Sequence, residues 1–330
     1  MSNFPKVLES IENLSLEQIK NLLSLSSTLH TKNPDLSKSP FSHCALTTIF
    51  FENSTRTKYS FIKAAWKLRI QAIDFPIGSS SLAKGEDFKE NLETLHHQGF
   101  SHIVIRTSDP DFFCHFHKGQ KDESPIVLLN GGNGMAEHPT QALLDLYTFM
   151  RDFGDNEELK KLKGKKICFV GDTLHSRVFH SHLKLAKMTG MEVTTSGPKT
   201  WSEGLVHHYD DFDEAIRESD ILYMLRVQKE RHQEKTDLNK MDDYVQQYGL
   251  DLDRLKANAK NLEQAKVYHP GPVNIGIELS KDIMETSYYR GYHQVECSIN
   301  MRAAILALSI IDNKNTQHNI TKEEVHDWLK

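Results

Sequence analysis

Cysteine pairs at metal-binding or redox spacing are missing from this sequence. Its four cysteines, Cys44, Cys114, Cys168 and Cys297, are far apart and form no CxxC motif. A disulfide framework and a zinc knuckle are therefore both disfavoured. Reduced thiols in a cytoplasmic protein are the simpler interpretation, and we expect no metal and no other cofactor.

Long apolar runs and clustered charge of one sign are also missing. The most apolar stretch, 303–311, is shorter than the roughly 20 residues that a membrane span needs, and we expect a buried helix there. The N-terminus has no basic region followed by an apolar stretch, so we expect no signal peptide. Basic and acidic residues are interspersed with a net charge of −5, which is unlike a nucleic-acid-binding face. We therefore expect neither a membrane nor a nucleic acid as partner, whereas a small acidic ligand is compatible with a local basic pocket.

The order of predicted elements indicates an α/β protein. Ser15 and Gln18 form a capping box before a first helix. Strands are predicted at 45–51, 72–77, 103–105, 126–129, 166–170, 192–195, 221–225 and 266–268. Helices alternate with them, a polar segment runs to about residue 260, and helices at about 297–313 and 322–330 close the chain. This pattern predicts two doubly wound parallel-sheet domains, joined by interdomain helices. We place a first domain at 1–151, a second at 152–296, and C-terminal helices that pack back on the first domain at 297–330.

Polar and basic groups follow the ends of these strands, where ligands bind in open α/β sheets. Ser54, Thr55, Arg56 and Thr57 follow the strand that ends at Phe51. A helix N-terminus binds anions through free N–H groups, and hydroxyls and an arginine fork strengthen such a site. One serine there would fit a simple helix cap. Three hydroxyls around an arginine favour anion binding instead.

Other strand ends leave several interpretations open. His138 begins a helix, with Pro139 next and Gln141 three residues on. It could be a ligand, a base, a donor or a structural histidine, and no second metal ligand stands at suitable spacing. His115 and His117 raise a weak metal alternative. Gly171-Asp172 lacks the GxGxxG pattern of dinucleotide sites. Lys84, in a loop beside Gly85, could be a solvated residue or could deliver charge to a bound anion.

Six segments, in this order, resemble the aspartate/ornithine transcarbamoylase family, and in particular its aspartate carbamoyltransferase catalytic chains. They are FFENSTRTKYSF, SSSLAKGE, HPTQALLDLYTF, VGDTLHSRV, LRVQKER and HPGPVNIGIEL, and they span about residues 45–305. The resemblance implies transfer of the carbamoyl group of carbamoyl phosphate to the amino group of L-aspartate. The products would be N-carbamoyl-L-aspartate and phosphate, in the second step of de novo pyrimidine synthesis. RVQKER and HPGP are the segments that favour aspartate over ornithine.

The resemblance also implies roles for individual residues. Ser54, Thr55, Arg56 and Thr57 would hold the phosphate. Thr57, Arg106 and His138 would contact the carbonyl oxygen, and Gln141 with the HPGP loop (Pro270, Gly271, Pro272) would lie near the carbamoyl NH2. Arg177, Arg226, Gln228 and Lys84 would bind aspartate. The catalytic residues would be Arg56, Thr57, Lys84, Arg106 and His138. Lys84 and Ser80 or Ser81 would come from a neighbouring subunit of a homotrimer with shared sites. Glu52 would bridge to Arg177 and Arg231 when the domains close.

Three positions depart from the family pattern. Asn53 replaces a small residue or Pro, Lys58 stands where Arg is usual, and Asn133 replaces the Asp of the common Ala-Gly-Asp-Gly. Two alternatives to the implied function are a transcarbamoylase with another acceptor and a non-catalytic paralogue with a scaffolding role. The retained Arg226-Val227-Gln228 argues against the first. The second would predict a broken site, whereas all of these residues are present: Arg56, Lys84, Arg106, His138, Arg177 and Arg226. A regulatory chain or a dihydroorotase would be a further partner compatible with such a trimer.

Overall fold

The computed structural model describes residues 3–32, 34–80, 82, 85, 87–114, 126–154, 159–202, 204–227, 238–313 and 320–330. The chain divides into two compact units. Unit 1 is Met1–Thr148 with Val295–Lys330, and unit 2 is Phe149–Gln294. Two helices contain the points of division: α5 (Pro139–Asp152) and α11 (Gly291–Asp312). Each unit is an α/β body with its own parallel sheet, so the predicted fold class is confirmed.

Unit 1 is built on a five-stranded parallel sheet in the order β1-β5-β4-β2-β3. The strands are β1 (Val7–Leu8), β2 (Ala45–Phe50), β3 (Gln71–Asp74), β4 (His102–Thr107) and β5 (Val127–Asn133). Its helices are α1 (Leu16–Thr31), α2 (Thr55–Lys67), α3 (Phe88–His97), α12 (Lys322–Leu329) and the adjoining parts of α5 and α11.

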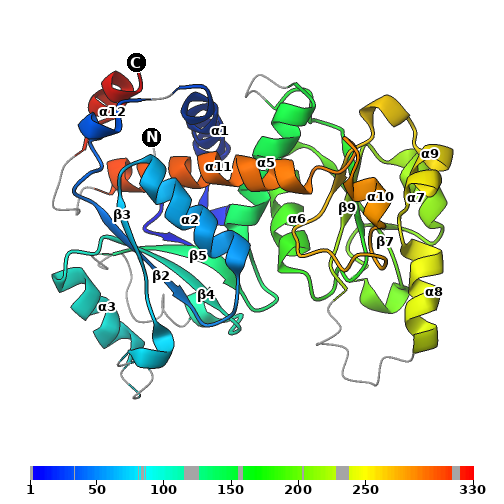
Figure 1. The fold of residues 1–330 in the computed structure, drawn as a ribbon, viewed down its shortest axis with the longest axis horizontal. Coiled ribbons are helices and arrows are strands. Elements are labelled where there is room, and N and C mark those ends of the chain that lie inside the picture. The colour runs from blue at the N-terminus through cyan, green and yellow to red at the C-terminus, as the bar shows by residue number, and fades with distance from the viewer. Residues whose placement is uncertain are drawn as a thin grey trace. The chain divides into compact units, whose positions relative to one another are not determined.

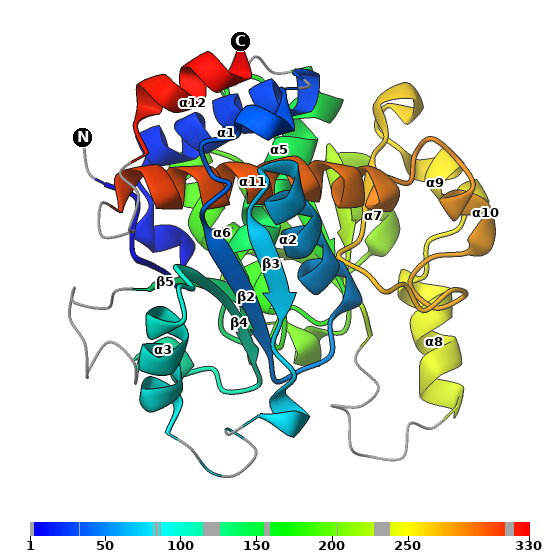
Figure 2. The same ribbon diagram turned by 60° about the vertical axis from the view of Figure 1, so that its left-hand side comes forward.

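Both faces of this sheet are covered, because successive strand residues point to opposite sides. Ile49, Ile103, Ile105 and Leu128 pack against Leu92 and Leu95 of α3. Helix α2 buries Phe61, Ala64 and Ala65, and Figures 1 and 2 show α2 and α3 on opposite faces of the sheet. This winding places the connection after β2 on one face and the connection after β3 on the other.

Unit 2 repeats the plan with the order β10-β9-β6-β7-β8. The strands are β6 (Lys166–Val170), β7 (Glu192–Ser196), β8 (His207–Tyr209), β9 (Ile221–Met224) and β10 (Val267–Tyr268), and all pair in parallel. The helices are α6 (Arg177–Thr189), α7 (Phe212–Glu218), α8 (Leu238–Tyr248), α9 (Leu252–Asn258) and α10 (Lys281–Met284).

The core of unit 2 also alternates along its strands. Cys168, Val170, Leu222 and Met224 pack in one cluster with α7 and α9. The residue between the first two, Phe169, instead makes edge contacts with Phe179 and His182 of α6. Both faces of β6 are therefore buried, as a central parallel strand requires.

Several elements differ from the sequence-based expectation. β5 continues through two glycines to Asn133, beyond the expected strand end at residue 129. β3 ends at Asp74, shortly before Pro76, which has no N–H to donate to a ladder. The polar segment before residue 260 contains α8 and α9, which bury few side chains, Tyr244 and Leu255 among them.

Helix α11 begins at Gly291, six residues before the expected start at 297. Among the described helices it alone is long and apolar enough to cross a membrane, and 72% of its apolar window is buried inside the structure. Met301 of α11 contacts Ser26 of α1, and Arg302 donates to Ser60 of α2. These contacts explain its composition as that of a core helix of unit 1.

Candidate active site

Each sheet has one point where the chain reverses its direction of winding, and the candidate residues lie there. In unit 1 the chain runs from β2 outward to β3 and then returns to β4 on the other side of β2. In unit 2 it runs from β6 to β7 and β8 and returns to β9 on the other side of β6. Ligands of open α/β sheets bind outside the carboxyl ends of the strands at such a point.

The N-terminus of α2 is open to an anion. Ser54 is its N-cap residue, yet its side chain makes no capping hydrogen bond, and the first turn holds no acidic residue. The N-cap hydroxyls of Ser15 and Ser176, by contrast, accept hydrogen bonds from their own helices. Thr55 and Arg56 are exposed. The first-turn N–H groups, the partial positive helix charge and these side chains together form a candidate anion-binding group.

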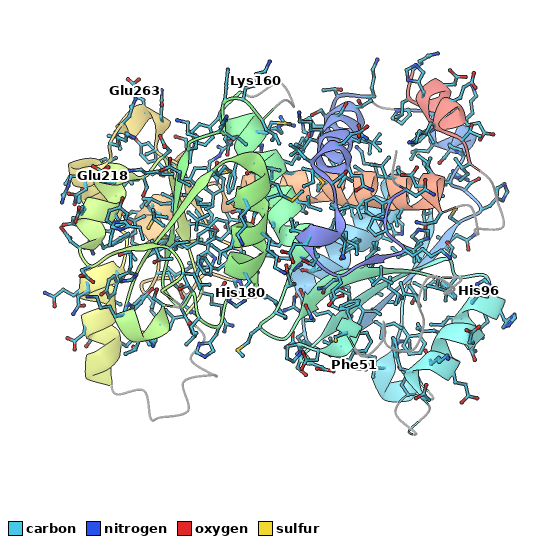
Figure 3. All side chains as sticks on the ribbon, turned by 180° about the vertical axis from the view of Figure 1, so that it is seen from behind. Phe51, His96, Lys160, His180, Glu218 and Glu263 are labelled. Atoms are coloured by element: carbon cyan, nitrogen blue, oxygen red, sulfur yellow. The ribbon has the colours of Figure 1, made fainter. Side chains whose placement is uncertain are left out.

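Arg106 lies beside this group because β4 pairs with β2. Phe50 and Arg106 are register partners, and the Phe51 N–H donates to the Arg106 carbonyl at 2.8 Å. The guanidinium donates to the Gly131 carbonyl at 3.2 Å and pairs with Glu52 at 3.4 Å. The backbone of the neighbouring strand and an acidic partner therefore orient Arg106, and Phe51 marks this edge in Figure 3.

His138 and Thr57 are brought together from two elements that are far apart in sequence. His138 directly precedes α5 and is buried, and its Nε2 lies 3.4 Å from the Thr57 Oγ1 of α2. A buried imidazole and hydroxyl in contact can present hydrogens to one ligand oxygen. The expected grouping of Thr57, Arg106 and His138 is thus located on adjoining elements of unit 1.

Gln141 has a partner that sequence reasoning missed. Its Nε2 donates to the Asp145 Oδ1 at 3.0 Å, one turn further along α5. Asp145 is fully buried, and so is Arg302 of α11. The i, i+4 spacing of Gln141 and Asp145 was a signal present in the sequence. The proximity of Arg302 to Asp145 gave no such signal, because Arg302 comes 157 positions later in the chain.

In unit 2, Arg177 is the first residue of α6 and is partly exposed. The loop before it is fixed by Asp172, which is buried and accepts from the His175 backbone N–H at 3.1 Å. The His175 ring also lies 2.9 Å from an Asp172 oxygen. This turn sets where α6 begins and therefore where Arg177 projects; His180, labelled in Figure 3, follows it on the same helix.

Arg226 and the HPGP loop meet through another buried acid, Glu278. The Glu278 carboxylate accepts from the Val227 N–H at 2.7 Å and from the Asn274 N–H at 2.6 Å. Asn274 in turn donates to the Val227 carbonyl at 3.1 Å. Burial raises the pKa of Glu278, and these hydrogen bonds oppose that shift. Glu278 therefore ties the strand end at Arg226 to the loop 269–274.

A backbone hydrogen bond within the HPGP loop fixes which ring nitrogen of His269 carries the proton. The Gly271 N–H donates to the His269 Nδ1 at 2.8 Å, so Nδ1 must be the unprotonated ring nitrogen. Gly271 has a φ of 67°, a conformation that favours glycine, and the Gly271–Pro272 bond is cis. Pro270 and Gly271 are partly exposed and Pro272 is exposed, so this part of the loop reaches the surface of unit 2.

Four predicted site residues lie outside the described residues: Ser81, Lys84, Gln228 and Arg231. His115 and His117 lie outside them as well. Ser80 is described, and its hydroxyl donates to the Ile77 carbonyl at 2.8 Å. Within the described ranges no group of three or more His, Cys, Asp or Glu side chains is arranged to hold a metal ion.

Comparisons with known proteins match both units. A model of the aspartate/ornithine carbamoyltransferase carbamoyl-P binding domain matches residues 6–151, and a model of the Asp/Orn binding domain matches residues 163–309. The aspartate carbamoyltransferase catalytic subunit of Malacoplasma penetrans is 36% identical over 93% of this chain and 97% of its own length. That of Fusobacterium nucleatum is 34% identical over 94% and 97%.

Solved structures agree. Aspartate transcarbamoylase from Trypanosoma cruzi in complex with carbamoyl phosphate and aspartate has a TM-score of 0.75, with 27% identity over 90% of this chain and 94% of that chain. The same enzyme in complex with N-(phosphonacetyl)-L-aspartic acid has a TM-score of 0.76, with 27% identity over 93% and 98%.

Proposed function

Because the chain belongs to the aspartate/ornithine carbamoyltransferase family, we propose that it transfers the carbamoyl group of carbamoyl phosphate to the amino group of L-aspartate. The products are N-carbamoyl-L-aspartate and phosphate, in pyrimidine synthesis. The single observation in this structure that most supports the proposed function is the open N-terminus of α2. There the hydroxyl of the N-cap residue Ser54, close to Arg56, makes no capping hydrogen bond.

The anion-binding group of unit 1 is the proposed carbamoyl phosphate site. The hydroxyls and backbone of Ser54 to Thr57 bind the phosphate, and Arg56 supplies a bidentate cation. Arg106, Thr57 and His138 donate to the carbonyl oxygen. Arg106 is already oriented by Gly131 and Glu52, so little side-chain freedom is lost when the substrate binds.

The chemistry then follows from these donors. The aspartate amine attacks the carbamoyl carbon, and negative charge develops on the carbonyl oxygen. Donors placed in advance stabilise that charge, and removing one typically costs roughly 3 to 4 kcal/mol. The new C–N bond replaces the C–O bond to phosphate, and the leaving phosphate takes the amine proton. His138 acts as a donor in this scheme and not as the base.

Arg177 and Arg226 of unit 2 are the proposed ligands of the two aspartate carboxylates, with Gln228 beside them. Each arginine adjoins a backbone segment that a buried acid holds. Arg177 follows the turn at Asp172, and Arg226 directly precedes Val227, whose N–H donates to Glu278. A guanidinium recognises a carboxylate through two parallel hydrogen bonds, so well-fixed arginines favour a dicarboxylic acceptor over a basic one.

We also propose a homotrimer whose active sites take Lys84 from a neighbouring subunit. Unit 1 supports this with exposed apolar side chains: Tyr59 (62%) and Trp66 (57%) lie two turns apart on α2, and Ile73 (54%) lies on the edge strand β3. Exposed apolar side chains near one edge are typical of an association surface. Mixing inactive Lys84→Ala and Arg56→Ala trimers should restore activity in hybrids if the sites are shared.

The acceptor is tested with labelled carbamoyl phosphate and equal concentrations of L-aspartate and L-ornithine. We expect label in N-carbamoyl-L-aspartate only, and Arg226→Ala should raise the KM for aspartate while leaving carbamoyl phosphate binding unchanged. Labelled citrulline would contradict the acceptor assignment. No labelled product from a folded protein would favour the non-catalytic alternative.

A further inference from the structure

The side chain of Gln141 is held by the carboxylate of Asp145, which in its ionised form has hydrogen-bond acceptors and no donor. The Asp145 Oδ1 accepts from the Gln141 Nε2–H at 3.0 Å, and the Gln141 side chain has no other hydrogen-bond partner among the described residues. A glutamine amide has donors at one end and an acceptor at the other. With Nε2 turned to Asp145, the acceptor Oε1 points away from it. Gln141 retains a small exposed area of 8%, so the outward end of its amide can reach a ligand.

The charge of Asp145 is supported by a buried cation. Arg302 is 2% exposed, and its Nη1 donates to the Ser60 hydroxyl of α2, which itself donates to the Thr57 carbonyl at 2.9 Å. Its guanidinium stacks over the Phe61 ring at 4.9 Å. Burial lowers the pKa of Arg302 to about 9, with the Asp145 carboxylate acting in the opposite direction. Arg302 is therefore still charged at pH 7 and favours an ionised Asp145.

Two nitrogen atoms of the Arg302 guanidinium make no hydrogen bond to the described residues. Its Nε and Nη2 are buried and have no hydrogen-bond partner among the described residues. A buried cation of this kind is costly unless nearby negative charge compensates it. Asp145 provides such a charge from α5, so the cation lies between the helix that begins at Thr55 and the helix that follows His138.

We propose that Asp145 is a positioning residue for substrate selection: with Arg302 behind it, it fixes the Gln141 amide so that Oε1 accepts from the carbamoyl NH2. This rests on the proposed function, which places that NH2 at Gln141. The arrangement distinguishes carbamoyl phosphate from acetyl phosphate, in which a methyl group replaces the NH2 and cannot donate.

The test compares the affinities of the trimeric protein for carbamoyl phosphate and acetyl phosphate by titration calorimetry. In Asp145→Asn the donor-only guanidinium of Arg302 favours the oxygen of the new amide, which leaves its NH2 facing Gln141. The Gln141 amide then turns, so that its NH2 group faces the NH2 group of carbamoyl phosphate and cannot accept from it. We expect the ratio of the two affinities to fall about tenfold, the effect of one hydrogen bond, while binding of acetyl phosphate changes little.

A matched control lies on the same helix. Thr148→Val removes a buried hydroxyl that donates to the Leu144 carbonyl at 2.7 Å, one turn beyond Asp145. It should lower stability without changing the affinity ratio. In a Gln141→Ala background the ratio should already be low, and adding Asp145→Asn should not lower it further.

Three results would overturn the proposal: an unchanged ratio in Asp145→Asn, an equal loss of both ligands, or a further fall without Gln141. If Asp145→Asn does not fold, Arg302→Lys and Arg302→Gln replace it. The first keeps the charge and should keep the ratio; the second removes the charge and should lower it, and equal ratios would contradict us. Wild-type carbamoyl transfer is measured first, because its absence would refute the proposed function itself, whereas normal transfer with an unchanged ratio refutes only the role of Asp145.

Discussion

At the scale of single residues, Asn133 shows how one amide holds the turn that leads to His138. Asn133 is buried, and its Oδ1 accepts from the Asn130 side chain at 2.8 Å and from the Glu137 N–H at 3.2 Å. Its Nδ2 donates to the Pro110 carbonyl at 2.6 Å. This departure from the family pattern therefore adds a donor that an aspartate would lack.

We expect Asn133→Asp to lower the free energy of unfolding by about 1 to 3 kcal/mol, because it leaves the Pro110 carbonyl unpaired and buries a charge. Urea unfolding measures this. Asn261→Asp is the control: Asn261 is an exposed helix cap, and aspartate caps as well as asparagine does. Equal stability of Asn133→Asp and the wild type would contradict the role of the Nδ2 donor.

His102 gives unit 1 a stability that depends on pH. It is buried, its Nε2 has no partner in the described part of the chain, and burial lowers its pKa from 6.5 to about 3. As the pH falls below 6.5, the unfolded chain binds a proton that the folded chain does not. The stability that unit 1 gains from keeping His102 neutral is therefore fully present above pH 6.5. It is lost progressively as the pH falls toward 3.

We predict that His102 destabilises unit 1 by about 2 kcal/mol between pH 7 and pH 5, since each pH unit below 6.5 costs about 1.4 kcal/mol. Urea unfolding of the wild type and His102→Gln at both pH values measures the difference, which should be absent in the variant. His97→Gln, an exposed position on α3, is the control. A variant with the same loss of stability as the wild type would refute this account.

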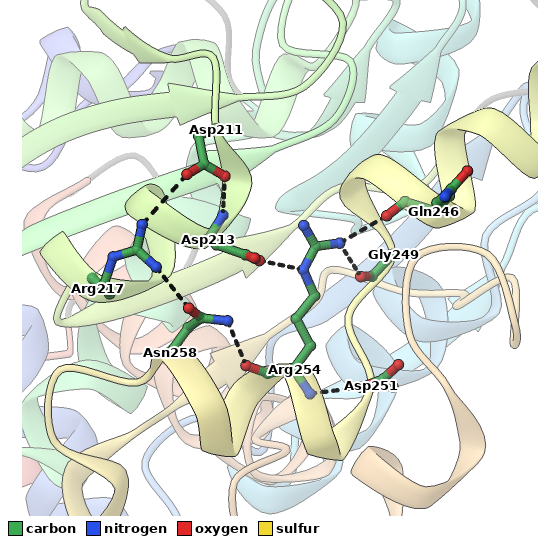
Figure 4. Close-up of polar contacts among 8 residues, drawn as sticks. All are labelled: Asp211, Asp213, Arg217, Gln246, Gly249, Asp251, Arg254 and Asn258. Atoms are coloured by element: carbon green, nitrogen blue, oxygen red, sulfur yellow. Dashed lines mark hydrogen bonds and ion pairs between the residues drawn. The ribbon is translucent and has the colours of Figure 1, made fainter.

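At the scale of elements, Arg254 joins α9 to α7 and to the end of α8 (Figure 4). Its Nε contacts the Asp213 carboxylate at 2.5 Å, and its Nη1 donates to the Gln246 and Gly249 carbonyls at 3.2 and 3.1 Å. The guanidinium also lies 4.7 Å from the centre of the Phe212 ring. One planar fork thus satisfies the C-terminal carbonyls of α8 and a first-turn acid of α7 together.

We expect Arg254→Ala to destabilise unit 2 by about 2 kcal/mol, and Arg254→Lys to recover little, because an ammonium cannot reproduce the fork. Figure 4 also offers the control: Arg217 contacts Asp211 at 3.3 Å and Asn258 at 2.7 Å, but the pair is about half exposed. Arg217→Ala should cost less than about 1 kcal/mol. Equal effects in thermal unfolding would argue against the special role of Arg254.

Elements with strong local signals could be predicted from the sequence. The capping box at Ser15 and Gln18 begins α1 as expected, and the predicted strand 166–170 is β6. β1 has two residues and β8 three, too few to show a period, and only pairing with β5 and β7 makes them strands. Polar α8 and α9 were missed because few apolar positions define their buried face.

At the scale of the whole molecule, the exposed apolar side chains of α2 are the basis for the proposed trimer. Trp66→Glu should convert a particle of three 37.9 kDa chains into single chains, measured by light scattering after gel filtration. Leu205→Glu, at a position in unit 2 that is more exposed (65%) than Trp66 (57%), should leave the mass unchanged. A wild-type mass of one chain would contradict the trimer.

The position of the STRT residues at the start of a helix could be predicted from the sequence. The hydroxyls and arginine of STRT are local in sequence, and their location at the start of α2 follows from strand-to-helix order. The burial of Asp145, Glu278 and Arg302 could not be predicted, because only the packed structure buries these charged side chains. The i, i+4 spacing of Gln141 and Asp145 was a local signal of one contact, whereas the positions of Glu278 and Arg302 depend on residues far away in the sequence.

The most direct test of the account is the rate of N-carbamoyl-L-aspartate formation by the wild type and by Arg56→Ala at saturating aspartate. If the open N-terminus of α2 binds the phosphate, the wild type turns over and Arg56→Ala loses about 100- to 1,000-fold in rate, with its melting temperature unchanged. A folded Arg56→Ala variant that turns over at the wild-type rate would contradict it.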